Sequence, residues 1–140
     1  AGLVAITPAS GFVGPMSAII IGGLAGFICY GGILLKSRLG YDDSLDVVGI
    51  HGVGGTWGAL ATGLFASREI NPAGFDGLFY GNPIQLWTQF VSVAATMVFS
   101  FSMTLIILKA IDMLLGLRVS KEDEEKGLDI AMHNETGYNL

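Results

Sequence analysis

Residues 16–35 read MSAIIIGGLAGFICYGGILL and contain no charged side chain. An α-helix rises about 1.5 Å per residue, so about 20 apolar residues cross the roughly 30 Å hydrocarbon core of a membrane. Two more stretches without Asp, Glu, Lys or Arg follow, at residues 47–67 and 84–108. The sequence therefore predicts an all-α integral membrane protein with spanning helices over residues 16–36, 44–67 and 84–115.

The composition argues against a soluble domain and against a nucleic-acid-binding protein. Of the 140 residues, 51% are hydrophobic and 14% are charged, whereas soluble domains carry about 25% charged residues. Three core helices of a soluble protein would need a large partner to cover them. The net charge of −5 gives no electrostatic basis for binding a phosphate backbone, so no nucleic-acid partner is expected.

Sites for metals, cofactors and catalysis are not expected either. Cys29 is the one cysteine, which excludes an internal disulfide, and the histidines and cysteine lack the spacing of a zinc site. No nucleophile, base and orienting acid occur together, and the glycine-rich stretches lack the lysine of a phosphate loop. An enzyme is therefore the least favoured class.

The regions before and after the helices differ in character. Residues 1–9 are apolar but too short for a full span, and Pro8, Gly11 and Pro15 predict the end of a truncated helix followed by an irregular connection. Such backbone persists in a membrane only where it packs in protein or faces a polar cavity. The helix predicted at 84–115 exceeds one membrane thickness, so it either tilts or projects into water.

Basic residues set the expected orientation. The connection after the first predicted helix carries Lys36 and Arg38, the next carries only Arg68, and three basic residues follow the third helix. Because cytoplasmic connections are enriched in Lys and Arg, we expect the first connection and the C-terminus to lie in the cytoplasm. The predicted location is the plasma membrane, crossed several times.

Residues 117–140 form a tail with six acidic and three basic side chains. One interpretation is a solvated extension that keeps the inner face soluble. The apolar residues within the tail and the break at Gly127 and Asp129 instead favour an ordered tail docked on its own protein. We expect Arg118, Gly127 and Asp129 to belong to such a regulatory tail.

His51 is the main candidate for a functional residue, because it lies about two turns inside the second predicted helix. An ionisable group at membrane depth is costly and usually faces the protein interior or a water-filled cavity. The alternative is a residue that only hydrogen-bonds between helices. In an α-helix Val47 shares the face of His51, and Ile50 lies about 100° away. An apolar lane with one imidazole suits a small neutral molecule better than a bare cation.

Acidic residues precede this helix. Asp43 or Ser44 is suited to the N-cap, and Asp46 falls in or near the first turn, where carboxylates accept unpaired amide hydrogens. We therefore favour a structural capping role over a direct ligand role. Farther along, Gly54 and Gly58 form a G-x-x-x-G pair, which predicts close helix approach. Trp57 is either an interfacial anchor or a core filler.

Three stretches carry a family resemblance. They are AGLVAITP at residues 1–8, DDSLDVVGIHGVGG at residues 42–55, and GLRV at residues 116–119, which is followed by Gly127-Leu128-Asp129 and His133. In order and spacing the chain resembles the ammonium transporter (Amt/Mep/Rh) family, and its tail is closest to the Amt/Mep branch. The resemblance implies the final third of an eleven-helix bundle: the end of helix eight, helices nine to eleven and the cytoplasmic tail.

The resemblance also implies a function. Each subunit of a homotrimer would move ammonium or ammonia through its own narrow hydrophobic pore across the lipid bilayer. His51 would be the second member of a pore histidine pair whose first member lies on sequence outside this chain. Thr7 would help line the path, with Val47 and Ile50 as apolar walls. Asp46 and Asp43 would be structural acidic residues near the inner end of the pore.

For the tail, the resemblance implies contact with the inner face and docking of PII-type signalling proteins. Thr136 is a phosphorylation site by position, although an ordinary polar end residue is the more common interpretation. Two alternatives stay open for the whole: a membrane-embedded ammonium sensor on the same scaffold, and a structural helical subunit of a membrane complex. The structural subunit predicts that His51 tolerates apolar replacement.

Overall fold

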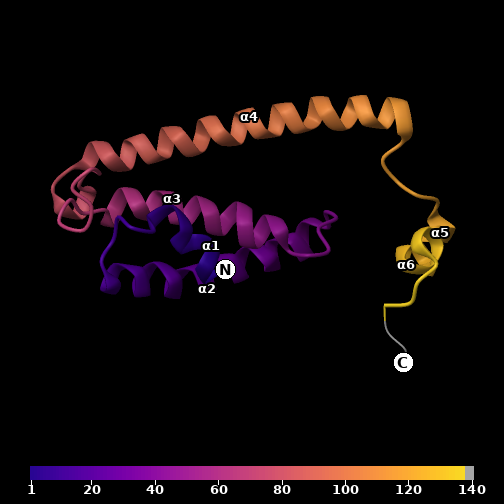
Figure 1. Ribbon diagram of the computed structural model, residues 1–140, viewed down its shortest axis with the longest axis horizontal. Coiled ribbons are helices and arrows are strands. Elements are labelled where there is room, and N and C mark those ends of the chain that lie inside the picture. The colour runs from indigo at the N-terminus through magenta and orange to yellow at the C-terminus, as the bar shows by residue number, and fades with distance from the viewer. Residues whose placement is uncertain (138–140) are drawn as a thin grey trace. The chain divides into compact units, whose positions relative to one another are not determined.

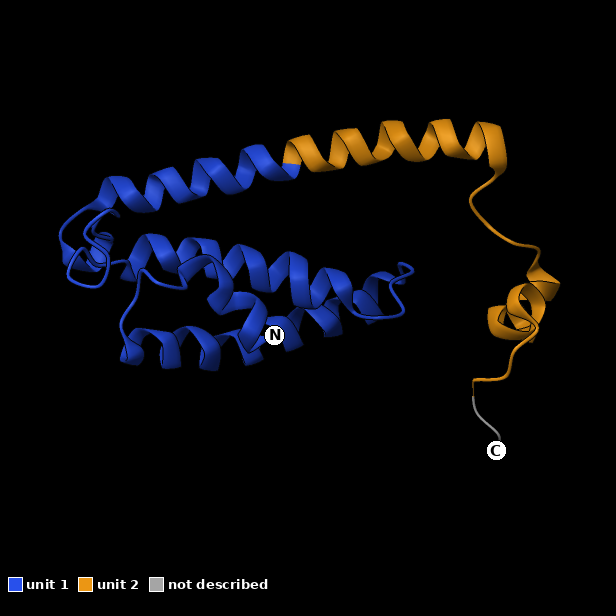
Figure 2. Ribbon diagram, viewed as in Figure 1, with its two compact units in different colours: residues 1–97 blue, residues 98–140 orange. Residues whose placement is uncertain are grey.

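A computed structural model describes residues 1–137, and all the regular structure in that range is helical. The chain divides into two compact units, residues 1–97 and 98–140, which Figure 2 shows in different colours. The division falls within one long helix. Residues 138–140 of the predicted tail lie outside the described residues.

The first unit begins with a short helix and continues into a long one. α1 (Gly2–Ile6) passes into the 3₁₀ turn η1 (Thr7–Ala9), as predicted for residues 1–9. After an irregular connection, α2 (Pro15–Leu39) starts with proline at its first position, where a missing N–H costs nothing. It ends at Gly40, whose N–H donates to the Lys36 carbonyl at 2.9 Å and whose left-handed φ of 69° turns the following chain out of the helix.

The second predicted span differs most from expectation. It consists of the π-helical turn η2 (Val48–Val53) continued by α3 (Gly54–Phe65), so it starts later than residue 44 and ends before residue 67. The late start has a local cause, because Asp46 has a left-handed φ of 56° and cannot be part of a right-handed helix. The membrane-spanning criteria of length and composition are met by α2 and α4 among the described residues.

α1, α2 and α3 pack side by side around a small core (Figure 1). The core residues are Ala5, Ala9, Ile21, Ala25 and Ala61, all fully buried. A Cβ at Gly58 would lie 2.1 Å from the carbonyl oxygen of Ala5, so this crossing requires glycine. The close approach predicted from the Gly54/Gly58 pair is therefore confirmed.

Trp57 is a core residue of this unit. Its indole Nε1–H donates to the carbonyl oxygen of Ile21 at 3.0 Å, which joins α3 to α2. The indole also packs against the buried cluster. Of the two interpretations of this tryptophan, the core filler is the one that the structure supports.

A connection with the 3₁₀ turn η3 (Leu78–Tyr80) leads into α4 (Pro83–Leu115). The Asp76 carboxylate fixes the connection by accepting the N–H of Arg68 at 2.8 Å. With 33 residues, α4 is about 50 Å long, which exceeds one membrane thickness as predicted. A Cβ at Gly63 would lie 2.8 Å from the Cα of Leu86, so α3 and the start of α4 also approach closely.

The tail contains two short helices, α5 (Lys121–Lys126) and α6 (Leu128–His133). Ser120 caps α5 by accepting the N–H of Asp123 at 3.2 Å, and Arg118 pairs with Glu124 at 2.7 Å. Gly127 separates the helices with a φ of 93°, so the break predicted there is confirmed. The Asp129 carboxylate accepts the N–H of Gly137. Docking of the tail on the rest of the protein stays a prediction.

Candidate functional site

His51 lies inside the π turn η2, between the end of an irregular connection and the start of α3. A π turn closes i→i+5 hydrogen bonds instead of i→i+4 bonds, is rare, and occurs frequently at functional sites. The His51 side chain is exposed and makes no hydrogen bond within residues 1–137.

The acidic residues before η2 are engaged by the protein itself. The two carboxylate oxygens of Asp43 accept the N–H groups of Val47 and Val48, each at 2.9 Å. These are the capping bonds that the sequence predicted for Asp43, whereas Ser44 makes none of them. Because both oxygens are occupied, this carboxylate stabilises the start of the turn.

Asp46 has a partner that was not predicted from the sequence. Its carboxylate forms an ion pair with Lys36, whose Nζ also donates to the carbonyl oxygen of Asp43 at 2.8 Å. Lys36 therefore joins the last turn of α2 to the first residues of the next segment. The one available signal was a basic residue at the end of one helix facing acidic residues across a short connection.

One side of η2 lies directly on α2. A Cβ at Gly49 would be 2.9 Å from Cγ1 of Ile33, and a Cβ at Gly32 would be 3.3 Å from the Cα of Gly49. Beside this contact, the buried thiol of Cys29 donates a weak hydrogen bond to the carbonyl oxygen of Ile50 at 3.9 Å. The backbone on either side of His51 is thus in van der Waals contact with α2.

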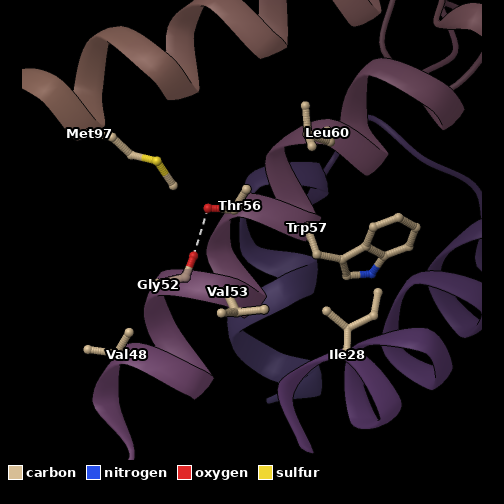
Figure 3. Close-up of a pocket in the computed structure, with 8 residues that line it drawn as sticks. All are labelled: Ile28, Val48, Gly52, Val53, Thr56, Trp57, Leu60 and Met97. Carbon is tan, nitrogen blue, oxygen red and sulfur yellow. Dashed lines mark hydrogen bonds between the residues drawn. The ribbon is translucent and has the colours of Figure 1, made fainter. Parts of the chain in front are cut away.

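An apolar pocket of about 450 Å³ lies next to η2 (Figure 3). It is lined by Ile28, Val48, Gly52, Val53, Thr56, Trp57, Leu60 and Met97. Its polar side chains are already hydrogen-bonded, since the Thr56 hydroxyl donates to the Gly52 carbonyl at 2.7 Å and the indole of Trp57 donates to Ile21. His51 is not among the lining residues, so the pocket and the imidazole belong to different faces of the turn.

The remaining predicted site residues are only partly brought together. Val47 is half exposed and precedes the π turn, while Ile50 is partly buried within it. Their expected angles to His51 assumed an α-helix and are wrong in detail, because a π turn rotates less per residue. Thr7 lies on η1, where its hydroxyl donates to the Leu3 carbonyl at 2.7 Å. No hydrogen bond joins Thr7 to His51 in the described part of the chain.

Comparison with known proteins places this arrangement in a family. The model of the Ammonium Transporter Family matches residues 1–138. The chain belongs to the ammonium transporter family. It is 54% identical over 139 residues to an ammonium transporter of Bacillus subtilis, covering 99% of this chain and 34% of that protein. It is 47% identical to the ammonium transporter Amt1 of Archaeoglobus fulgidus, covering 99% of this chain and 35% of that protein.

Solved structures support the same fold. The crystal structure of Mep2 from Saccharomyces cerevisiae superposes with a TM-score of 0.80 at 35% identity, over 86% of this chain and 29% of that one. The crystal structure of Mep2 from Candida albicans superposes with a TM-score of 0.79 at 37% identity, over 87% of this chain and 28% of that one. The chain is therefore part of an integral membrane helical bundle of this transporter family, which confirms the resemblance seen in the sequence. It spans about a third of the length of the relatives that it matches.

Proposed function

We propose that this chain forms the C-terminal third of an ammonium transporter and that His51 lines the conduction path. The observation that supports this most directly is the contrast between His51 and the acidic residues before it. Both carboxylate oxygens of Asp43 cap the start of η2, and one carboxylate oxygen of Asp46 pairs with Lys36. The His51 imidazole is the ionisable group of η2 and α3 and is left exposed for a partner.

The chemistry of this segment favours a neutral passenger over a bare cation. Cation sites are built from rings of carbonyl or carboxylate oxygens. Of the carboxylates here, Asp46 is paired with Lys36, and both oxygens of Asp43 accept backbone N–H groups. A neutral imidazole donates with one ring nitrogen and accepts with the other, as ammonia does with its N–H groups and lone pair. In this proposal ammonium loses its proton or hydration shell before the path. Ammonia then passes His51 and a second histidine supplied by sequence outside this chain.

The roles of the other residues that line the proposed conduction path are assigned from their positions in the sequence. Val47 and Ile50 form apolar walls of the path, and Thr7 contributes a hydroxyl from the neighbouring segment. Asp46 and Asp43 hold the inner end of the path in shape. Three such subunits form a homotrimer, each with its own pore.

The surroundings of the protein are part of the proposal. The lipid bilayer, or the remaining helices of the transporter, cover the large apolar side chains of α4, such as Val98 at 69% exposed. The protein crosses the plasma membrane with its C-terminus in the cytoplasm. The tail, shaped by Arg118, Gly127 and Asp129, is the docking region for a PII-type signalling protein, and the exposed Thr136 is a modification site.

The test is His51→Ala in a chain of the relatives' full length, reconstituted in vesicles. We expect the ammonium flux to fall by at least about tenfold, or the preference for ammonium over methylammonium to be lost. The conduction path would then lack the imidazole that replaces the hydration shell of the passing molecule. The flux and the ratio of the two fluxes are measured for each assembled protein.

The matched control is His133→Ala, which removes the second histidine of this chain from the tail and is expected to leave the basal flux unchanged. Full flux and selectivity in His51→Ala would remove His51 from the mechanism. Binding of ammonium without any flux in the parent protein would support the sensor instead of the transporter.

A further inference from the structure

We propose that Gly49 and Gly32 are positioning residues that hold His51 in its π-helical register, an inference that rests on the proposed role of His51 in conduction. His51 itself is exposed and has no hydrogen bond to a described residue. Its direction is therefore fixed by its backbone, and the contact that fixes this backbone is the approach of Gly49 to α2.

The approach is close on both sides. A Cβ added at Gly49 would lie 2.9 Å from Cγ1 and 3.2 Å from the backbone nitrogen of Ile33. A Cβ added at Gly32 would lie 3.3 Å from the Cα of Gly49 and 3.2 Å from Cγ2 of Val53. Since Gly49 precedes His51 by two residues and Val53 follows it by two, Gly32 contacts the turn on both sides of the histidine.

A second contact continues the same line along α2. A Cβ at Gly54 would lie 2.9 Å from Sγ of Cys29, whose thiol also donates to the carbonyl oxygen of Ile50. Ile50 provides the peptide bond that leads into His51. The backbone from Gly49 to Gly54 thus packs against α2. An added Cβ at Gly49 or at Gly54 would lie closer than 3 Å to an α2 side chain.

The register matters because π and α turns orient side chains differently. A turn that closes i→i+5 bonds rotates less per residue than an α turn, so a return to α geometry would rotate His51 relative to α3. A π turn is rare because an isolated helix does not prefer it, so a specific tertiary contact must select it. The packing of Gly49 against α2 provides that contact. The Asp43 cap and the Lys36–Asp46 ion pair stabilise the start of the turn.

The experiment compares glycine-to-alanine variants in a chain of the relatives' full length. Gly49→Ala and Gly32→Ala fill the contact. Gly55→Ala lies six residues after Gly49 and Gly31→Ala lies next to Gly32, and the Cβ added at either position meets no described atom within 4 Å. The measurements are ammonium flux, the ammonium-to-methylammonium flux ratio, the pH profile of flux, the amount of assembled protein and its thermal midpoint.

A shift of a few tenths of an ångström at a positioned group predicts a loss on the order of tenfold in flux per assembled Gly49→Ala protein. Gly32→Ala is expected to lose less, because its nearest neighbour is a movable valine methyl group. Both should change the flux ratio or the pH profile, which loss of stability alone does not change. The two control variants should stay within about twofold of the parent in all measurements, since their added Cβ contacts none of residues 1–137.

A rescue variant distinguishes a local steric clash at Gly49 from misfolding of the protein. Ile33→Ala removes the Cγ1 atom nearest to the added Cβ, so Gly49→Ala combined with Ile33→Ala should recover part of the flux and selectivity, with Ile33→Ala alone as its reference. If the contact variants assemble normally and match the controls, the proposal is overturned. It is also overturned if flux falls only in proportion to assembled protein, or if a structure of Gly49→Ala keeps the same π turn and the same His51 direction.

His51→Ala in the same assay separates this inference from the proposed function. If His51→Ala keeps full flux and selectivity, the role of His51 in conduction fails. If His51→Ala loses flux or selectivity while Gly49→Ala and Gly32→Ala behave as their controls, only the positioning role fails.

Discussion

α2 and the segment formed by η2 and α3 lie against each other, yet they are built differently. α2 is one uninterrupted helix of 25 residues, and most of its glycines would accept a Cβ without any contact within 4 Å. The second segment begins with a π turn, and Gly49, Gly54, Gly58 and Gly63 would each bring a Cβ within 3 Å of a neighbour. The difference indicates that α2 is a support, whereas the second segment is fixed from several sides around one histidine.

This contrast agrees with a general pattern. Proteins follow local sequence rules where packing alone is required and depart from them at functional or strained positions. In the second segment, the departures are the positive φ of Asp46 and the π turn that contains His51. Three substitutions test the contrast, in order of decreasing effect.

Gly58→Ala is expected to have the largest effect. Its Cβ would lie 2.1 Å from the backbone oxygen of Ala5, which cannot rotate away, so α1 and α3 must separate. Overpacking of this kind predicts a loss of about 3 kcal/mol in the free energy of unfolding. The thermal midpoint of the purified full-length protein measures it.

The matched control for this substitution is Gly22→Ala in α2, where an added Cβ meets no atom of the described residues within 4 Å. It should be neutral or stabilise by up to about 1 kcal/mol, because alanine has the higher helix propensity. Equal effects of the two variants would contradict the difference between the two segments.

The sequence predicted the regular elements well for a simple reason. The absence of charge placed α2 and α4 within a few residues of their bounds, and glycine chemistry predicted the break at Gly127. Proline positions also agree with the end of the short helix α1 and the turn η1 before residue 10. These features depend on local sequence or on the thickness of a membrane, both of which can be read along the chain.

The π turn could not be predicted in the same way. Helix prediction from the spacing of apolar residues assumes 3.6 residues per turn. The local sequence VGIHGV contains no feature that indicates an i→i+5 hydrogen bond. The turn depends on tertiary contacts between Gly49 and α2 and on an ion pair between Lys36 and Asp46, which lie on either side of a non-helical connection. The pairing of His51 with a second histidine is implied only by the family resemblance, so it stays a prediction.

Asp43→Ala should have an intermediate effect. It removes the acceptor of the Val47 and Val48 N–H groups, and loss of a helix cap costs about 1–2 kcal/mol. Hydrogen exchange of these two amides should accelerate, and the thermal midpoint should fall. Asp43→Asn retains one accepting oxygen and should lose less.

Ser44→Ala serves as the control for the cap, since the Ser44 side chain makes no capping bond among the described residues. It should leave amide exchange at Val47 and Val48 unchanged. If Asp43→Ala leaves these amides as protected as in the parent, the start of η2 is held by the Lys36–Asp46 pair alone and the cap is dispensable.

Trp57→Phe should have the smallest effect of the three. The substitution keeps an aromatic ring in the core but removes the Nε1–H that donates to the Ile21 carbonyl, and one such hydrogen bond contributes about 1 kcal/mol. Trp87→Phe is the matched control, because Trp87 is 64% exposed and stacks on Phe90 without a hydrogen bond among residues 1–137. The fall in thermal midpoint should therefore appear at Trp57 and be absent at Trp87. A fall at Trp87 alone would mean that contacts of α4, and not the bond between α2 and α3, hold the second segment in place.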